Sequence, residues 1–134
     1  MSDEVTVLFA NEAFYAAFAG RDLAAMDTLW SRGFAVTCIH PGWLPLLGRD
    51  AVMESWKAIL TAPDSPAIVC WNASVYVLYD SAYVLCNEQL QRGFLVATNV
   101  FIRENGGWRM VHHQAGACPP PGSLATASDR GPLQ

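Results

Sequence analysis

The chain has few charged side chains, and fewer of them are basic than acidic. Only 15% of its 134 residues are Asp, Glu, Lys or Arg, and its 8 Lys and Arg residues are scattered along the sequence. The formal net charge is −4, so the chain lacks the basic patch that binds nucleic acid. No apolar run approaches the roughly 20 residues that a membrane-spanning helix needs. We therefore expect neither a nucleic-acid partner nor a membrane association.

Cysteines are few, and we expect no secretory leader. The four cysteines, Cys38, Cys70, Cys86 and Cys118, match no zinc-binding or Cys-x-x-Cys spacing. Three of them lie in apolar, strand-like runs, where a free thiol behaves as a small hydrophobe, although two disulfides are an alternative. The acidic residues at 3–4 are not followed by the apolar core of a secretory signal. These features favour a reduced, cytoplasmic protein.

Apolar residues are abundant instead. They make up 52% of the sequence, which is above the usual share for a soluble domain. A length of 134 residues allows one domain with a single core. Such an apolar surplus in a soluble chain indicates a lined cavity or a face for self-association.

Hydrophobic periodicity divides the chain into helices followed by strands. Apolar stripes predict helices over residues 3–20, 23–30 and 48–61, with Asp22 as the N-cap of the second. Apolar runs predict strands over residues 34–40, 68–79, 82–91, 94–103 and 107–115. This order is an α+β layout, and we expect one domain over residues 1–117. Residues 118–134, rich in Pro, Gly and Ser, are expected to form a disordered tail.

Three histidines are the leading functional candidates. His112 and His113 are neighbours in a predicted strand, so one must face the interior and the other must face outward. His40 ends an apolar strand just before Pro41. If His40 shares one interior with the inward member of the pair, the core contains a polar site.

Turn positions predict which side chains share a face of the sheet. If residues 80–81, 92–93 and 105–106 are two-residue turns, His112 lies opposite Asn99 and on the same face as Glu88. That face is polar only around Glu88, Asn99, His112 and Gln114, and its apolar members include Phe101. This pattern predicts a cavity with a small polar patch, and it places His113 on the outer face. A slip of one residue would exchange the two faces.

Four motifs resemble the SnoaL-like branch of the nuclear transport factor 2-like superfamily, which includes the ketosteroid isomerases. They are Phe18 to Leu23, Val36 to Pro41, Gly48 to Trp56, and Trp108 to His113. The resemblance covers about residues 5–116. It implies a cone-shaped, strongly curved antiparallel sheet wrapped around three N-terminal helices, with an internal pocket. It also implies a homodimer formed through the outer sheet face, because family members commonly associate in this way.

The isomerase branch implies a role for His40. In those enzymes a catalytic Asp precedes a Pro after the first strand, and His40 before Pro41 occupies that position here. A histidine near its reference pKa of about 6.5 can act as a base near neutrality. The isomerases also use an oxyanion-stabilising Tyr on the first helix. Here Phe14 takes that place and Tyr15 is turned away by roughly 100°, which argues against steroid-type isomerisation.

A more distant resemblance is to the association domain of calcium/calmodulin-dependent protein kinase II. It rests on Thr98 to Phe101 and on Trp108 to Gly116. Where that domain carries pocket arginines, this chain has Glu88 and Asn99. A carboxylate ligand is therefore not expected.

Two functions remain open from the sequence. The first is an acid–base enzyme of isomerase, dehydratase or cyclase type, without metal or organic cofactor, that acts on an apolar carbonyl compound. Its candidate catalytic residues are His40, Glu88 and His112, and its candidate substrate-binding residues are Tyr15, Trp43, Trp56, Asn99, Phe101 and Gln114. The second is a non-catalytic dimeric domain that binds a small apolar ligand or a partner protein. In that case Glu88, Asn99 and His112 only satisfy one another in the core.

Overall fold

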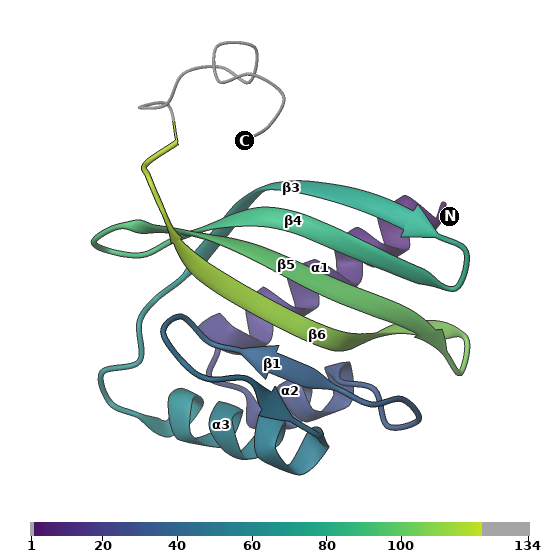
Figure 1. Ribbon diagram of the computed structural model, residues 1–134, viewed down its shortest axis with the longest axis horizontal. Coiled ribbons are helices and arrows are strands. Elements are labelled where there is room, and N and C mark those ends of the chain that lie inside the picture. The colour runs from purple at the N-terminus through teal and green to yellow at the C-terminus, as the bar shows by residue number, and fades with distance from the viewer. Residues whose placement is uncertain (1, 122–134) are drawn as a thin grey trace.

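The computed structural model describes residues 2–121 and confirms the α+β class (Figure 1). Its three helices are α1 (Asp3–Ala19), α2 (Leu23–Leu29) and α3 (Arg49–Thr61). Its strands are β1 (Thr37–Ile39), β2 (Leu46–Leu47), β3 (Val69–Leu78), β4 (Ser81–Gln89), β5 (Phe94–Glu104) and β6 (Gly107–Cys118). They form one six-stranded sheet in the order β2-β1-β6-β5-β4-β3. The sheet is mixed rather than purely antiparallel, because β1 runs parallel to β6.

Local sequence explains where the helices begin. The hydroxyl of Ser2 accepts a hydrogen bond from the amide of Val5 at 3.3 Å and caps α1. Asp22 caps α2 as predicted, and its carboxylate accepts from the amide of Ala25 at 3.0 Å. Before α3 the chain turns at Gly48 with a φ of 90°, a conformation that favours glycine.

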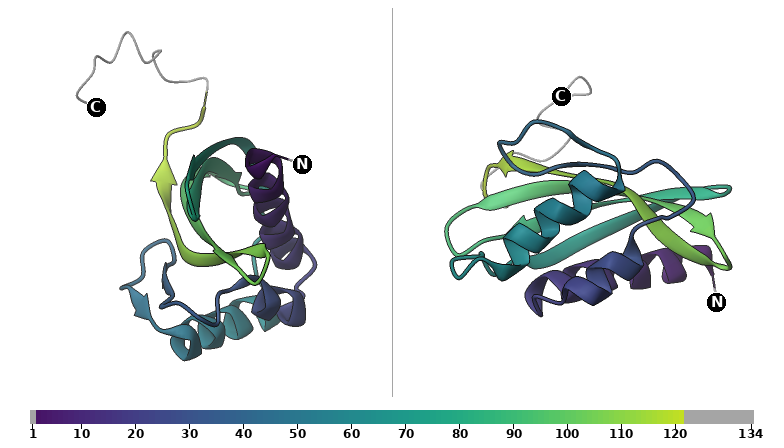
Figure 2. Two further views of the ribbon diagram at one scale, coloured as in Figure 1. Left: turned by 90° about the vertical axis from the view of Figure 1, so that its right-hand side faces the viewer. Right: turned by 90° about the horizontal axis from the view of Figure 1, so that it is seen from below.

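The sheet curves strongly, and α1 lies along its open side (Figure 2). Helix α1 packs against β3, β4 and β6, while α3 packs against α2, β1 and β2. The core fills the space between the helices and the concave face of the sheet. Its largest fully buried side chains are Trp30, Trp56, Phe14, Phe101, Met26 and Met110.

Two of the predicted turns are displaced, yet the displacement leaves the sheet faces unchanged. Leu78 pairs with Ser81, so the β3–β4 turn uses residues 79–80. Gln89 pairs with Phe94, so the β4–β5 turn uses residues 90–93. Each pairing differs by two residues from the predicted one. Because side chains alternate with a period of two, Glu88 remains on the inner face.

The third turn, at residues 105–106, is confirmed, but a bulge follows it in β6. Phe101 pairs with Met110, whereas Val100 pairs with His112, so the strand contains one extra residue at Val111. The predicted facing of all residues beyond this point was therefore wrong. His113 lies on the inner face, opposite Asn99.

A second bulge interrupts β3 between Trp71 and Ser74. Within it Asn72 has a φ of 59°, a left-handed conformation that Asn tolerates better than most residues. Trp71 pairs with Asn87 on the outer face and is 37% exposed. Cys70 contacts the core from the inner face.

Strand β6 extends to Cys118, three residues beyond its predicted end at Ala115. Cys118 therefore lies in the sheet and not in a tail. The rest of the predicted tail falls mostly on residues 122–134, which lie outside the described part of the chain. Within the described residues, no helix is both long and apolar enough to cross a membrane.

Candidate functional site

A pocket of about 290 Å³ lies where the ends of α1 and α3 meet the sheet. It is lined by Phe18, His40, Pro41, Trp43, Ile59, Pro66, Ile68, Glu88, Leu90, Leu95 and His113. Eight of these side chains are apolar, and His40, Glu88 and His113 are the polar ones. A mostly apolar hollow with a few converging polar groups is typical of a small-molecule site.

His40 follows β1, and its Nε2 lies 2.9 Å from the hydroxyl of Ser55 in α3. The Ser55 hydroxyl donates its proton to the backbone oxygen of Val52 at 2.6 Å. It must therefore accept from His40 Nε2–H, which leaves Nδ1 of His40 as the unprotonated nitrogen. Burial lowers the pKa of His40 to about 4. The ring is thus neutral at neutral pH.

Glu88 lies on the inner face of β4, between the pocket and α1. Its Oε2 accepts a hydrogen bond from the Tyr15 hydroxyl at 2.5 Å. Burial raises the pKa of Glu88, and the hydrogen bond from Tyr15 opposes part of that rise. Burial, with Glu88 nearby, raises the pKa of Tyr15 as well, so the phenol keeps its proton. Burial therefore shifts Glu88 toward its protonated form relative to an exposed glutamate.

His113 is 2% exposed, and its Nδ1 lies 2.6 Å from Oδ1 of Asn99. Burial lowers the pKa of His113 to about 3, and the nearby His40 and His112 lower it further. Its ring centroid is 6.3 Å from that of His40. The two imidazoles can thus reach one small ligand from neighbouring positions.

The structure brings together some of the predicted site residues and separates others. His40, Glu88 and Trp43 line the pocket. Buried side chains outside the pocket lining are Tyr15, Trp56, Asn99 and Phe101. Trp56 packs against the site, because its ring centroid lies 4.8 Å from that of His40.

Two predicted site residues lie on the opposite face of the sheet. His112 is half-buried there, with its Nδ1 2.6 Å from the hydroxyl of Thr37. Gln114 is exposed on the same outer face. The extra residue at Val111 causes both errors, because it exchanges the faces of the residues that follow it. His113 takes the place that the sequence assigned to His112.

Sequence reasoning also missed Ser55 and Asn11, although both carry a signal. Ser55 follows Val52 by three positions and precedes Trp56, so it lies on the apolar stripe of α3. Asn11 lies four residues after Val7 on the buried stripe of α1. A polar side chain on an apolar stripe needs a buried partner, and each of these has one.

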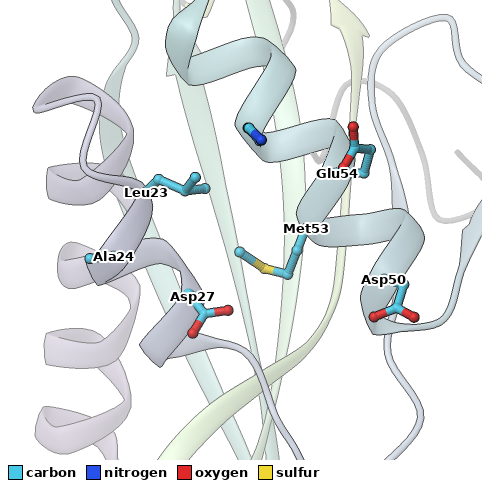
Figure 3. A pocket seen from close by; sticks show the side chains of 7 residues that line it. Leu23, Ala24, Asp27, Asp50, Met53 and Glu54 are labelled. Carbon is cyan, nitrogen blue, oxygen red and sulfur yellow. The ribbon is translucent and has the colours of Figure 1, made fainter.

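A larger hollow, of about 610 Å³, lies on the surface between α2 and α3 (Figure 3). Its lining is apolar at Leu23 and Met53 and acidic at Asp27, Asp50 and Glu54. The Asp27 carboxylate is already paired with Arg49 at 2.8 Å. This groove contains no histidine and no buried acid, so we assign the chemistry to the smaller pocket. Across residues 2–121, no three His, Cys, Asp or Glu side chains are grouped so that they could hold a metal ion.

The curved sheet, the three helices and the internal pocket define a nuclear transport factor 2-like domain. The chain belongs to the SnoaL-like domain family, whose model matches residues 7–119.

Solved structures and one curated protein extend this comparison. A candidate dehydratase of the NTF2-like family from Streptomyces avermitilis is 31% identical, with a TM-score of 0.80 over 88% of this chain and 97% of that one. A candidate calcium/calmodulin-dependent protein kinase type II association domain from Thiobacillus denitrificans is 36% identical, with a TM-score of 0.74 over 81% and 92%. The F-box protein SKIP8 of Arabidopsis thaliana is 30% identical over 81% of this chain. The chain spans about half of that plant protein's length, namely 48%.

Proposed function

We propose that the protein is an acid–base enzyme of isomerase, dehydratase or cyclase type that acts on an uncharged, apolar carbonyl compound. The observation that supports it is one pocket whose polar wall consists of His40, His113 and Glu88. Both imidazoles are neutral at neutral pH, and the carboxyl group is biased toward its protonated form. A base and an acid thus face the same small space.

Pocket charge and size support a neutral substrate. The lining contains no Lys or Arg, so a carboxylate or phosphate ligand would be desolvated without a counter-charge. A volume of about 290 Å³ suits a compound with one or two rings. The apolar side chains would hold its hydrocarbon part.

The proposed reaction begins with enolisation. Nδ1 of His40 removes a proton from the carbon next to the carbonyl, and the C–H electron pair forms the new C=C bond. The carbonyl π pair moves to oxygen, which takes the Glu88 proton. With a β,γ-unsaturated ketone, isomerisation ends when the dienol takes the His40 proton at the γ-carbon, the carbonyl re-forms and the enol proton returns to Glu88. In a dehydration the enol proton returns to Glu88 and the carbonyl re-forms as the β-carbon–oxygen bond breaks, and the proton held by His40 leaves with hydroxide as water. The candidate dehydratase at 31% identity supports the second variant.

Exchange of α-protons tests this proposal without knowledge of the natural substrate. The test incubates 2-tetralone and a panel of one- and two-ring ketones with the protein in D₂O, and NMR follows loss of the α-proton signals. We expect wild type to accelerate exchange of at least one ketone. His40→Ala and Glu88→Gln should each reduce that rate about 100-fold or more, in line with general acid–base catalysis.

The matched control for this experiment is His112→Ala. His112 is the sequence neighbour of His113 but lies on the outer face, so its removal should leave the exchange rate within about twofold of wild type. An equal loss in His40→Ala and His112→Ala would contradict the proposal, as would exchange at the buffer rate across the whole panel.

The second candidate function is a non-catalytic association or ligand-binding domain. The candidate association domain at 36% identity favours it, and so does the outer sheet face, where Tyr76, Leu85 and Val96 are exposed. We propose that this face forms a homodimer in either case. The four cysteines are free thiols, which fits the proposed cytoplasmic location.

A further inference from the structure

Asn99 is a fully buried amide that connects two groups of the pocket wall, His113 directly and Glu88 through Tyr15. Its side chain is 0% exposed and does not line the pocket. Its Oδ1 lies 2.6 Å from Nδ1 of His113. Its Nδ2 donates to Oδ1 of Asn11 at 2.8 Å and to the hydroxyl of Tyr15 at 3.1 Å. Tyr15 in turn donates to Glu88 at 2.5 Å.

The chemistry of an amide sets the direction of each hydrogen bond in this network. An Asn side chain has two N–H donors on nitrogen and one acceptor oxygen. Asn11 points its own nitrogen toward Cys70 Sγ at 3.8 Å, so its oxygen faces Asn99 and must accept. Asn99 therefore presents its nitrogen to Asn11 and Tyr15 and its oxygen to His113.

Two consequences follow for the groups on the pocket wall. His113 must donate its Nδ1–H to Asn99, because the facing amide atom is an acceptor. Its Nε2 then keeps a lone pair, and no hydrogen-bond partner for Nε2 is found among the described residues. The Tyr15 oxygen accepts from Asn99, and its proton goes to Glu88 at 2.5 Å, which is the closer of its two remaining partners because Cys86 Sγ lies at 3.3 Å.

We propose that Asn99 is the positioning residue of this pocket, and that its single amide fixes His113 as the Nδ1–H tautomer and orients the Tyr15 proton toward Glu88. The inference rests on the proposed function, because it explains how the acid Glu88 and the second imidazole of the pocket wall, His113, are both oriented. It also replaces the predicted role of Asn99, which was direct contact with substrate. The amide lies behind the wall and acts through His113 and Tyr15.

Two substitutions separate the two arms of the network. Asn99→Leu is similar in size and removes both arms. Asn99→Asp keeps an acceptor for His113 but cannot donate to Tyr15, so the Tyr15 proton turns toward the new carboxylate and away from Glu88. Asn87→Leu, on the outer face of the neighbouring strand β4, is the matched control.

The experiment is ¹⁵N NMR of the histidine rings at neutral pH, which distinguishes the two neutral tautomers directly. We expect wild-type His113 to be the Nδ1–H tautomer. Asn99→Leu should lose this single tautomer and give a mixture, whereas Asn99→Asp and Asn87→Leu should retain a proton on Nδ1. An Nε2–H tautomer in wild type would overturn the inference even if no variant folds. An unchanged tautomer in folded Asn99→Leu would overturn it as well.

Exchange of α-protons then provides the second readout. Asn99→Asp should lower kcat for 2-tetralone exchange about tenfold or more with little change in KM, because it disturbs the acid and not the apolar wall. A normal kcat in this variant would contradict the Tyr15 arm. If wild type shows the Nδ1–H tautomer but exchanges no ketone, the proposed function fails while the assignment of His113 stands.

Discussion

His112 and His113 are adjacent residues in different surroundings. His113 is sealed against Asn99 and Phe14, with its ring 4.9 Å from that of Phe14. His112 is half-buried on the outer face of the sheet, where it meets the hydroxyl of Thr37. Strand β6 therefore carries His113, which lines the pocket, and the adjacent His112, which lies outside the pocket and serves as a control.

This contrast predicts different stabilities for two matched variants. His113→Gln should lower the free energy of unfolding by about 1–3 kcal/mol, because it disturbs a buried hydrogen bond and the packing around it. His112→Gln should change it by less than about 1 kcal/mol. Urea unfolding at pH 7.5 measures both. Equal losses would contradict the inward placement of His113.

Burial of two neutral histidines also predicts a loss of stability in acid. The pKa values of His40 and His113 fall from 6.5 to about 4 and about 3 on folding. Between pH 6.5 and these values the unfolded chain binds more protons, so stability falls as pH falls. At pH 5 each histidine should contribute a loss of about 2 kcal/mol relative to pH 7.5.

Glu88 acts in the opposite direction. Its raised pKa means that the folded protein binds the extra proton, so its contribution grows as pH falls and is lost as pH rises through the folded pKa. Burial raises the pKa values of the neighbouring Tyr15 and Cys38, so these two groups stay neutral over this range. Urea unfolding of wild type and His40→Gln at pH 7.5 and pH 5 tests the balance. The variant should lose about 2 kcal/mol less than wild type, and an identical pH dependence would contradict the buried, neutral His40.

Several residues of the pocket were predictable from the sequence. His40 and Glu88 could be found because a polar residue beside an apolar strand or on an apolar sheet face is conspicuous. Trp43 could be found because its apolar loop follows His40 directly. Ser55 and Asn11 are visible only when each helix stripe is checked for polar members.

At the scale of single elements, β6 explains the principal error in the predicted site. The sequence correctly predicted the turn at residues 105–106, yet the facing of the residues after Val111 was wrong because of the bulge. At the other two turns the strand pairing differs by two residues from the predicted pairing, and this difference leaves the faces unchanged. An even slip leaves a two-residue period intact, whereas one extra residue reverses it. Val111 is an ordinary strand residue, so nothing in its identity reveals a bulge.

Deleting Val111 tests this account of β6. After the deletion Met110 still faces inward, His112 outward and His113 inward, because only the unpaired residue has gone. The variant should fold with a loss of about 1–3 kcal/mol. Deletion of Arg109, in the regular part of the strand, would turn buried Trp108 outward and should cost more than about 3 kcal/mol.

Urea unfolding and the ¹⁵N signals of the histidines measure the outcome. The Val111 deletion should keep His113 neutral near pH 5, as in wild type. If this variant unfolds and the Arg109 deletion does not, the bulge has been assigned to the wrong part of β6.

The fold of the whole molecule could be predicted from the sequence more reliably than the site could. Helices followed by long strands gave the α+β class, and motifs such as Phe18 to Leu23 indicated the family. The short strand β2 at residues 46–47 is absent from the predicted strands, because two residues beside Pro45 carry no periodicity. The arrangement of helices and sheet depends on many residues, so an error at one residue does not change the predicted fold. A pocket depends on a few side chains, so one such error changes the predicted site.

The proposed homodimer is a property of the whole molecule. Leu85 is exposed on the outer face, halfway along β4. Leu85→Glu should dissociate the dimer, because a charge in an apolar interface is left without a partner. Leu44→Glu, at an exposed leucine in the loop between β1 and β2, is the control and should leave the dimer intact. Sedimentation equilibrium reports both masses, and a monomeric wild type would contradict the proposal.

The most direct test of the central claim is one pH titration of the free protein by NMR. It follows the Glu88 carboxyl carbon, identified with Glu88→Gln, together with the rings of His40 and His113. We predict that Glu88 titrates above the ordinary range of a glutamate, while the two rings stay neutral until about pH 4 and pH 3. Protonation of both rings near pH 6.5, with Glu88 titrating as an ordinary glutamate, would contradict a buried acid–base pocket.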